Sequence, residues 1–376
     1  MPALKISRFT VLNRLVFPMV KLMLAKNALI FIAIMILASG CHEKRPESGY
    51  FLIPPPKQTI KTPTGLAGYL RMQNLPTVES VENWNTSQAN FSEGLKITTA
   101  HYEVFTTLKD PLMLRDVPAF IETCFNNFRS TADGLSGQIQ TTSRFTIYLF
   151  DNRTQWQSFT RSFAGSQSQV YSRIKAGAYY LNGACVAYNI GRERTFRALG
   201  HECWHQFVDR TFVFRLPSWL NEGIAMQFES NVYKNGLFYF EPAENSYRLD
   251  SLKKTFEQNQ VIPLETLLES DPGDLLGDDP QVSAFYSQCY ALVRFLRQAD
   301  AGKRKTDFNR LLAGALEGKW PLSDEDKKIA SDRTIPLTSD WNKIAGPLLF
   351  KHYFAGNLDG IEKQYLDFCR DITVDK

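Results

Sequence analysis

Two histidines one helical turn apart, in His201-Glu202-Cys203-Trp204-His205, are the residues whose types and spacing most clearly suggest chemistry. On an α-helix, positions i and i+4 share a face, so both imidazoles can reach one Zn²⁺ at about 2.0–2.1 Å. Glu202 projects roughly 100° round such a helix, beside the metal, where its carboxylate can take a proton from a water molecule. Because the chain has only five histidines, a chance match is rare. Two surface histidines beside a glutamate are the alternative interpretation.

A catalytic zinc site needs a third protein ligand and one open position. Glu222 follows His205 with sixteen residues between them, in the segment Pro217-Ser218-Trp219-Leu220-Asn221-Glu222-Gly223-Ile224-Ala225. Pro217 suits the first turn of a helix, and that helix can return antiparallel to the first and carry Glu222 to the metal. An exposed helical acid is the alternative for Glu222 taken alone.

The two motifs together, His-Glu-x-x-His and Trp-Leu-Asn-Glu-Gly-x-Ala, resemble the gluzincin metallopeptidases, the thermolysin-like and aminopeptidase group. The resemblance covers roughly residues 97–300, and the separation of the motifs is slightly shorter than in the aminopeptidases. It implies that Glu222 is the third ligand of one zinc per chain. It also implies an α+β zincin fold, in which an N-terminal mixed sheet with an edge hairpin packs on the active-site helix and a helical C-terminal subdomain follows.

The segment Gly177-Ala178-Tyr179-Tyr180 precedes the zinc helix, where gluzincins have the edge strand whose backbone pairs with an extended substrate. The resemblance therefore assigns substrate contacts to Gly177, Ala178 and Tyr179, and a free strand edge can make them. An ordinary core hairpin is the alternative. The aminopeptidases carry a glutamate on this strand that binds the substrate's amino terminus. Tyr180 and Leu181 stand there instead, which favours an endopeptidase-like cleft.

The segment Phe285–Leu296 resembles the aminopeptidase helix that opens with a tyrosine. That tyrosine donates a hydrogen bond to the oxyanion of the tetrahedral intermediate, and it corresponds to Tyr286. Tyr290, one turn along, is an alternative donor, and an ordinary core aromatic is the alternative for either residue.

The N-terminus reads as a secretion signal, with five basic residues and no acid before residue 41 and an apolar run at residues 27–39. Leu37-Ala38-Ser39-Gly40-Cys41 resembles the bacterial lipobox, which implies a lipid on Cys41. An uncleaved anchor helix is the alternative. Translation could also start at Met19 or Met23.

We therefore predict a signal peptide over residues 1–40, and a Pro-rich tether with a weakly patterned lead-in over residues 41–95. A peptidase domain follows over residues 96–376, with its N-terminal subdomain at about 96–210 and its helical subdomain at about 211–376.

Charge and cysteine usage narrow the possible functions. The net charge of +4 comes from the N-terminus, because residues 41–376 hold 38 basic and 39 acidic side chains. A nearly neutral body gives no support for a nucleic-acid partner. The five cysteines beyond Cys41 lack disulfide-like spacing, so we expect small buried apolar residues with at most one or two bridges. The acidic segment at residues 269–279 lacks the EF-hand pattern, which favours a solvated loop over a Ca²⁺ site.

Hydrophobic periodicity predicts the elements that position these residues. Strands are expected at residues 97–108 and 144–150, and hairpins at Asn182-Gly183 and Asn235-Gly236. Helices are expected at residues 116–129, 153–163 and 192–209 and from Pro217 to about Ser230, with a mostly helical chain from Leu252 onward.

The prediction for function is zinc-dependent hydrolysis of peptide bonds in the bacterial cell envelope. Its partners would be a peptide or protein substrate and the membrane that holds Cys41. The alternative is a lipid-anchored binding or scaffold protein whose zinc site is not catalytic. Every residue that the reaction requires is present, which favours the enzyme.

Overall fold

The computed structural model describes residues 65–84, 94–131, 139, 143–174, 177–275, 278–335, 337–354 and 357–374. The predicted signal peptide, Cys41 and the tether up to residue 64 lie outside the described residues. Within the described ranges, no helix is long and apolar enough to cross a membrane.

The protein is α+β, as predicted, and its centre is a mixed six-stranded sheet in the order β1-β2-β3-β4-β6-β5. β3 pairs in parallel with β4, and β4 with β6, whereas the remaining neighbours are antiparallel. The strands are β1 (Ser80–Asn83), β2 (Leu95–Thr98), β3 (Tyr102–Thr106), β4 (Phe145–Phe150), β5 (Ala178–Leu181) and β6 (Ala184–Tyr188). β5 is thus an edge strand, and its hairpin with β6 turns at Asn182 and Gly183, which both have positive φ.

The single strand expected at residues 97–108 is wrong, because two strands, β2 and β3, fold back on each other there. The turn between them is Thr99-Ala100-His101, which contains no glycine, proline or asparagine to announce it. The carboxylate of Glu122 holds the turn by accepting hydrogen bonds from the Thr99 hydroxyl and the His101 backbone N–H. Both strands of a tight hairpin share the period-2 pattern, so the alternation continues across the turn.

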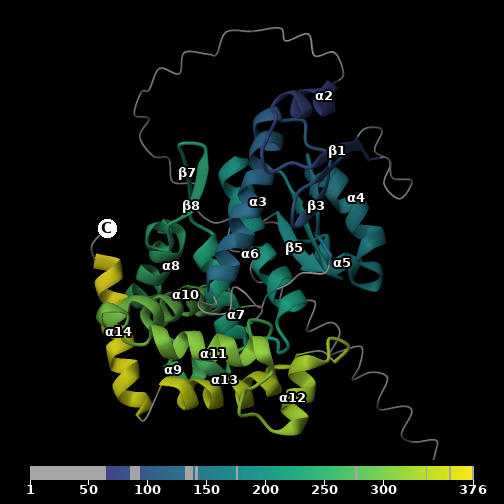
Figure 1. Cartoon of the computed structure of the whole chain (residues 1–376). Coiled ribbons are helices and arrows are strands. Elements are labelled where there is room, and N and C mark those ends of the chain that lie inside the picture. Colours follow the sequence, from purple (N-terminus) through teal and green to yellow (C-terminus); the bar gives the residue numbers. More distant parts are fainter. Residues whose placement is uncertain are drawn as a thin grey trace, which may run out of the picture.

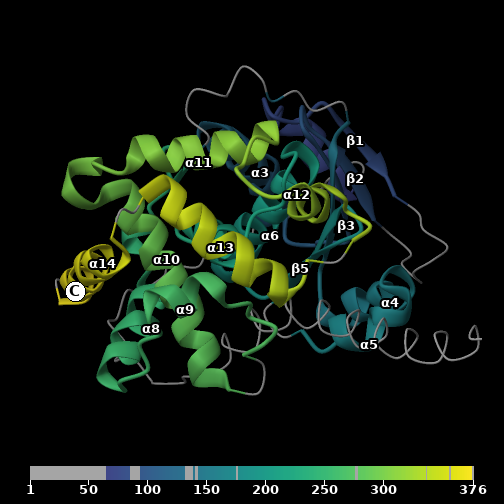
Figure 2. The same ribbon diagram turned by 90° about the horizontal axis from the view of Figure 1, so that it is seen from below.

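Helices cover both faces of the sheet (Figures 1 and 2). α3 (Pro111–Thr131) and α6 (Arg192–Thr211) pack together on one face, and α4 (Arg153–Phe163) and α5 (Ser168–Tyr171) lie on the other. The expected helices at residues 116–129, 153–163 and 192–209 are confirmed, although α3 begins five residues earlier. A short helix, α2 (Gly65–Met72), precedes β1, in a region that the sequence pattern left unplaced.

The rest of the chain is mostly helical, as predicted, and lies beside the sheet domain (Figure 1). α10, the longest of these helices, contacts α7, α8, α9, α11 and α14 and forms their centre. The helices are α7 (Ser218–Ala225), α8 (Ser246–Glu257), α9 (Leu264–Glu269), α10 (Asp279–Gly302), α11 (Lys305–Glu317), α12 (Asp324–Ser331), α13 (Ser339–Phe354) and α14 (Leu358–Val374). A second predicted hairpin, β7 (Asn231–Lys234) and β8 (Leu237–Phe240), is confirmed and turns at Asn235 and Gly236.

The cysteines behave as small apolar core residues. All five described cysteines are buried and free: Cys124, Cys185, Cys203, Cys289 and Cys369.

Candidate metal centre

Three predicted ligands converge between α6 and α7. The ligand atoms of His201, His205 and Glu222 all lie within 4.8 Å of one another, and the three side chains are buried. Nε2 of His201 lies 3.3 Å from Oε2 of Glu222, and Nε2 of His205 lies 3.6 Å from Oε1 of Glu222. This is the one group of three metal-ligating side chains found within the described ranges.

Close packing of two helix pairs sets this convergence. Nε1 of Trp204 donates a hydrogen bond to Oδ1 of Asn221 over 3.1 Å and so joins α6 to α7 beside the ligands. On the other side of α7, a Cβ placed on Gly223 would lie 2.6 Å from the carbonyl oxygen of Cys289 on α10. Real Cβ contacts do not come that close, so the residue after Glu222 must be glycine for α10 to approach α7.

The centre contains buried polar atoms that the protein itself leaves unsatisfied. Nε2 of His201, Oε2 of Glu222, Oε2 of Glu202 and the Tyr286 hydroxyl each have no hydrogen-bond partner among the described residues. A buried unsatisfied polar group typically costs about 1–3 kcal/mol, which a bound ligand can offset. Two imidazole nitrogens and a carboxylate are the ligand set of a catalytic zinc site with an open position, so the residues present fit this metal.

A second carboxylate, from Glu229, orients His201. Oε1 of Glu229 lies 3.0 Å from Nδ1 of His201, and Glu229 also accepts from Nε and Nη2 of Arg248 and from Nδ2 of Asn245. A hydrogen bond at Nδ1 fixes the ring and directs Nε2 towards the metal position. The sequence motifs did not predict Glu229, which lies beyond the end of α7 and after the 3₁₀ turn Met226–Phe228.

Charge around the centre favours a cation. Burial opposes the ionisation of Glu222, but His205 and His201 outweigh it and lower the pKa of Glu222 to about 2. Likewise, Arg248 outweighs burial at Glu229 and holds the pKa of that carboxyl well below its usual range. Burial lowers the pKa of His201, yet the carboxylates of Glu222, 3.3 Å from Nε2, and Glu229, 3.0 Å from Nδ1, outweigh burial and raise it to about 10. At neutral pH both carboxylates are therefore ionised around His201.

Glu202 lies beside the ligands in a different electrostatic setting. Burial raises the pKa of its carboxyl, and the neighbouring charges of His201 and His205 partly offset that rise. The backbone N–H of Tyr180 on β5 also hydrogen-bonds this carboxylate. A raised carboxyl pKa brings the group nearer to neutral pH, where a general base is most effective.

Tyr286 and Tyr290 differ in how their hydroxyls are bonded. Burial and the charge of Glu222 raise the pKa of the Tyr286 phenol, which reflects its closeness to that ligand. The Tyr290 hydroxyl instead donates to the carbonyl oxygen of Pro242 and accepts from Nη1 of Arg294. Of the two tyrosines, Tyr286 has its hydroxyl available at the centre.

β5 runs beside α6 at the free edge of the sheet, where the resemblance placed a substrate strand. The Tyr188 N–H donates to the carbonyl oxygen of Gly177, so the ladder alternation turns the backbone of Gly177 and Tyr179 towards β6. The backbone groups of Ala178 and Tyr180 point to the free edge. The side chains of Ala178 and Tyr179 are fully buried, so β5 offers its backbone at this edge.

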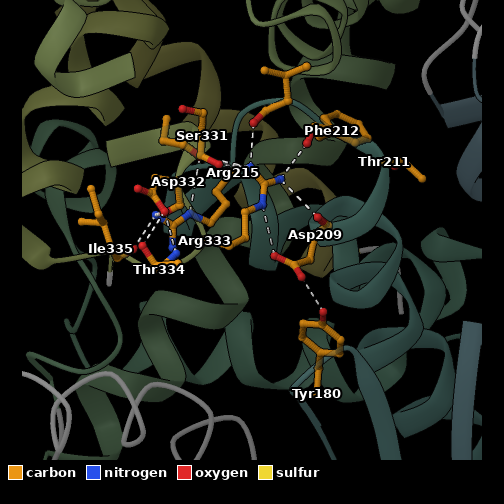
Figure 3. Close-up of polar contacts among 12 residues, drawn as sticks. Tyr180, Asp209, Thr211, Phe212, Arg215, Ser331, Asp332, Arg333, Thr334 and Ile335 are labelled. Carbon is orange, nitrogen blue, oxygen red and sulfur yellow. Dashed lines mark hydrogen bonds and ion pairs between the residues drawn. The ribbon is translucent and has the colours of Figure 1, made fainter. Parts of the chain in front are cut away.

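A cavity of about 270 Å³ opens beside the ligands. His205 and Glu222 line it together with a polar cluster of Tyr180, Asp209 and Arg215. The Asp209 carboxylate accepts from the Tyr180 hydroxyl over 2.6 Å and pairs with Nε of Arg333 at 3.4 Å (Figure 3).

The Arg215 guanidinium donates to four backbone carbonyls, those of Ile329, Ala330, Asp332 and Ile335. The sequence offered no signal for these residues, Tyr180, Asp209, Arg215 and Arg333, which together form the wall cluster. Aliphatic side chains complete the lining: Leu181, Val208, Leu216 and Leu337.

The acidic segment at residues 269–279 holds no metal-ligand group within its described part. Asp274, Asp278 and Asp279 are exposed, as expected for a solvated loop. Asp271 is not solvated: it is buried at the cavity and accepts hydrogen bonds from Ser218 and Asn342.

Comparison of the chain with family models, curated proteins and solved structures finds no match.

Proposed function

We propose that this protein is a zinc-dependent peptidase of the gluzincin type, with an endopeptidase-like cleft and a zincin-like arrangement of its sheet and helices. The observation that carries the proposal is the convergence of His201, His205 and Glu222 beside two further groups with unsatisfied atoms, Glu202 and Tyr286. These are the groups that metal-assisted hydrolysis of an amide requires.

His201, His205 and Glu222 would hold the zinc, with Glu229 orienting His201. When bound, zinc lowers the pKa of a water molecule and polarises a carbonyl group. The remaining chemistry belongs to the protein. Glu202 accepts the proton of the attacking water and later delivers it to the leaving amine, a role that its raised pKa supports.

The Tyr286 hydroxyl donates a hydrogen bond to the oxygen that gains charge as the carbonyl is attacked. Its fixed, buried position supports this role, because a preorganised donor stabilises the transition state without reorganising. Burial also keeps the phenol protonated at neutral pH, since the pKa of Tyr286 lies well above its usual value.

The free edge of β5 supports binding of an extended peptide, with Ala178 presenting its N–H and carbonyl and Tyr180 its carbonyl, since the Tyr180 N–H is bonded to Glu202. The side chain next to the cleaved bond would enter the 270 Å³ cavity. At the position where the aminopeptidases have a glutamate, the Tyr180 hydroxyl is already bonded to Asp209. This arrangement favours an endopeptidase. A lipid on Cys41 would hold the enzyme at a membrane of the cell envelope.

The test combines metal analysis with digestion of a broad peptide library. We expect one zinc per chain in the wild type, its loss in His205→Ala, and cleavage that Glu202→Gln abolishes without changing zinc content. Glu193→Gln is the matched control, because Glu193 is an exposed acid on the same helix. A wild type that binds no zinc after reconstitution contradicts the proposal. Zinc binding without cleavage of any peptide would instead indicate the alternative, a binding or scaffold protein.

A further inference from the structure

The β7–β8 hairpin presents an apolar face to solvent. In its register Val232 lies opposite Tyr239, and Lys234 lies opposite Leu237. These four residues form the outer hairpin face, on which Val232, Leu237 and Tyr239 are 39%, 58% and 46% exposed. On the other side of the hairpin, Phe238 is buried. Hairpins of soluble proteins usually carry polar residues on the solvent side, so this face suggests a contact surface.

The hairpin is anchored firmly to the catalytic half of the molecule. Phe238 packs edge-on against Phe120 of α3 and Phe196 of α6, with ring centroids 5.2 and 5.4 Å apart. The guanidinium of Arg192 lies 5.9 Å from the Phe238 ring and 5.5 Å from the Tyr233 ring. The exposed apolar side chains are therefore held in place by a rigid support.

The described chain begins at the same end of the molecule. Figure 1 shows α2 and the β7–β8 hairpin at the upper end of the molecule. α3 connects them, because it packs against both α2 and β8. Cys41 precedes Gly65, the first residue of α2, by 24 positions, which span at most about 80 Å when extended. A lipid on Cys41 would thus keep this end of the molecule within reach of the bilayer.

We propose that the outer hairpin face docks on the bilayer that holds the lipid of Cys41. The inference rests on the proposed lipid anchor, not on the peptidase activity. Its side chains suit a membrane interface: Val232 and Leu237 can enter the acyl boundary, Tyr239 can lie at headgroup level, and Lys234 can meet anionic headgroups. A tethered domain needs little additional affinity to stay docked, because the tether makes the second contact intramolecular.

Docking would fix the orientation of the metal centre. The hairpin follows Glu229 after one residue, and its inner face packs on Phe196, five residues before His201 on the same helix. The distance from the bilayer to the centre would then be set by rigid elements, and the accessible substrates would be peptides near the membrane surface.

The test places a nitroxide at Leu237→Cys in the lipidated full chain, reconstituted in vesicles of phosphatidylethanolamine and phosphatidylglycerol. The described native cysteines are buried, so the introduced thiol is the accessible target among them. Ile344→Cys is the matched control, since Ile344 is 51% exposed on α13. We expect the label at position 237 to collide many-fold less with a water-soluble nickel complex, and more with oxygen, than the label at position 344.

Equal nickel accessibility at both positions overturns the proposal. Protection at position 237 without a gain in oxygen collisions, together with a dimer mass in light scattering, overturns it in favour of a second copy. Mass spectrometry of Cys41 in the same sample separates the anchor from the docking. If Cys41 carries lipid but the label at position 237 is as accessible to nickel as the label at position 344, the lipid anchor is confirmed and the docking is contradicted. Val232→Cys repeats the measurement if Leu237→Cys does not fold.

Discussion

Two polar clusters line the same cavity, and they differ in how their atoms are satisfied. At the metal centre, His201, Glu202, Glu222 and Tyr286 each keep a buried atom without a hydrogen-bond partner among the described residues. In the wall cluster, Asp209 is bonded by Tyr180 and Arg333, and Arg215 donates to a set of backbone carbonyls.

This contrast distinguishes side chains that are positioned to bind a ligand from side chains that stabilise the fold. Unsatisfied buried atoms lower stability, so they persist where binding offsets the cost. A satisfied cluster instead stabilises the structure that surrounds it, and here it joins β5, the end of α6 and the segment after α12. Changes at the metal centre should therefore alter binding and turnover, whereas changes in the wall cluster should alter stability.

The largest effect is expected from Glu229→Gln. This change leaves the buried Arg248 without its carboxylate, which typically costs about 3–5 kcal/mol of unfolding free energy. It also weakens the hydrogen bond that orients His201, so zinc affinity should fall about 10–100-fold. Denaturant unfolding of the metal-free protein and competition with a chelator measure the two effects.

Glu257→Gln, an exposed acid on α8, is the control and should match the wild type in both measurements. Unchanged zinc affinity in a folded Glu229→Gln variant would show that His201 does not depend on this carboxylate.

Tyr286→Phe should lower kcat by about 10²–10³ and leave KM nearly unchanged, because its hydrogen bond forms mainly in the transition state. Steady-state kinetics on a peptide found in the library digest provide the measurement. Tyr290→Phe is the matched variant on the same helix, and its bonds to Pro242 and Arg294 predict a smaller loss of activity. A larger loss in Tyr290→Phe would reverse the assignment of the two tyrosines.

Asp271 also lines the cavity, and its buried carboxyl predicts a pH dependence of the unfolding free energy. Burial raises its pKa to about 6, although the Gly273 N–H and the Ser218 hydroxyl partly oppose this. The folded protein then binds this proton more tightly than the unfolded chain does. The contribution of Asp271 is fully present below pH of about 4 and is lost as the pH rises through about 6.

Asp271→Asn has no carboxyl to titrate, so its unfolding free energy should not show this fall between pH 4 and 7. In the wild type the fall amounts to at most about 3 kcal/mol, because the pKa of Asp271 is raised by about two units. Denaturant unfolding at pH 4, 5, 6 and 7 compares the two proteins. Parallel stability profiles would mean that Asp271 is ionised throughout this range.

What the sequence could predict follows from how far apart the interacting residues lie in the chain. His201, Glu202 and His205 occupy one helix, so their spacing alone specified their geometry. The hairpins at Asn182-Gly183 and Asn235-Gly236 were also local, since their turns need residues that accept positive φ. The turn at residues 99–101 was missed because its stabilising partner, Glu122, comes from another element.

The wall cluster was beyond prediction from the sequence for the same reason. Asp209 and Arg333 are separated by 124 residues, and neither lies in a recognisable motif. Arginines and aspartates are common on the surface of any chain, and only the fold brings Arg333, in the segment after α12, to Asp209 near the end of α6. Tyr286 was an intermediate case: a resemblance suggested it, but the choice against Tyr290 needed the structure, in which the Tyr290 hydroxyl is hydrogen-bonded and the Tyr286 hydroxyl is not.

The smallest effect, and the sharpest test of the comparison, is expected from Tyr180→Phe. The change removes the hydroxyl that bonds Asp209 but keeps the backbone N–H that bonds Glu202. Because Arg333 still pairs with Asp209, unfolding free energy should fall by only about 1 kcal/mol. Zinc content and affinity should match the wild type.

Tyr239→Phe, at an exposed position on β8, controls for loss of a phenol and should change stability by less than about 0.5 kcal/mol. If Tyr180→Phe instead lost zinc or turnover while staying folded, the wall cluster would be helping to arrange the metal centre. The division between the two clusters would then be wrong.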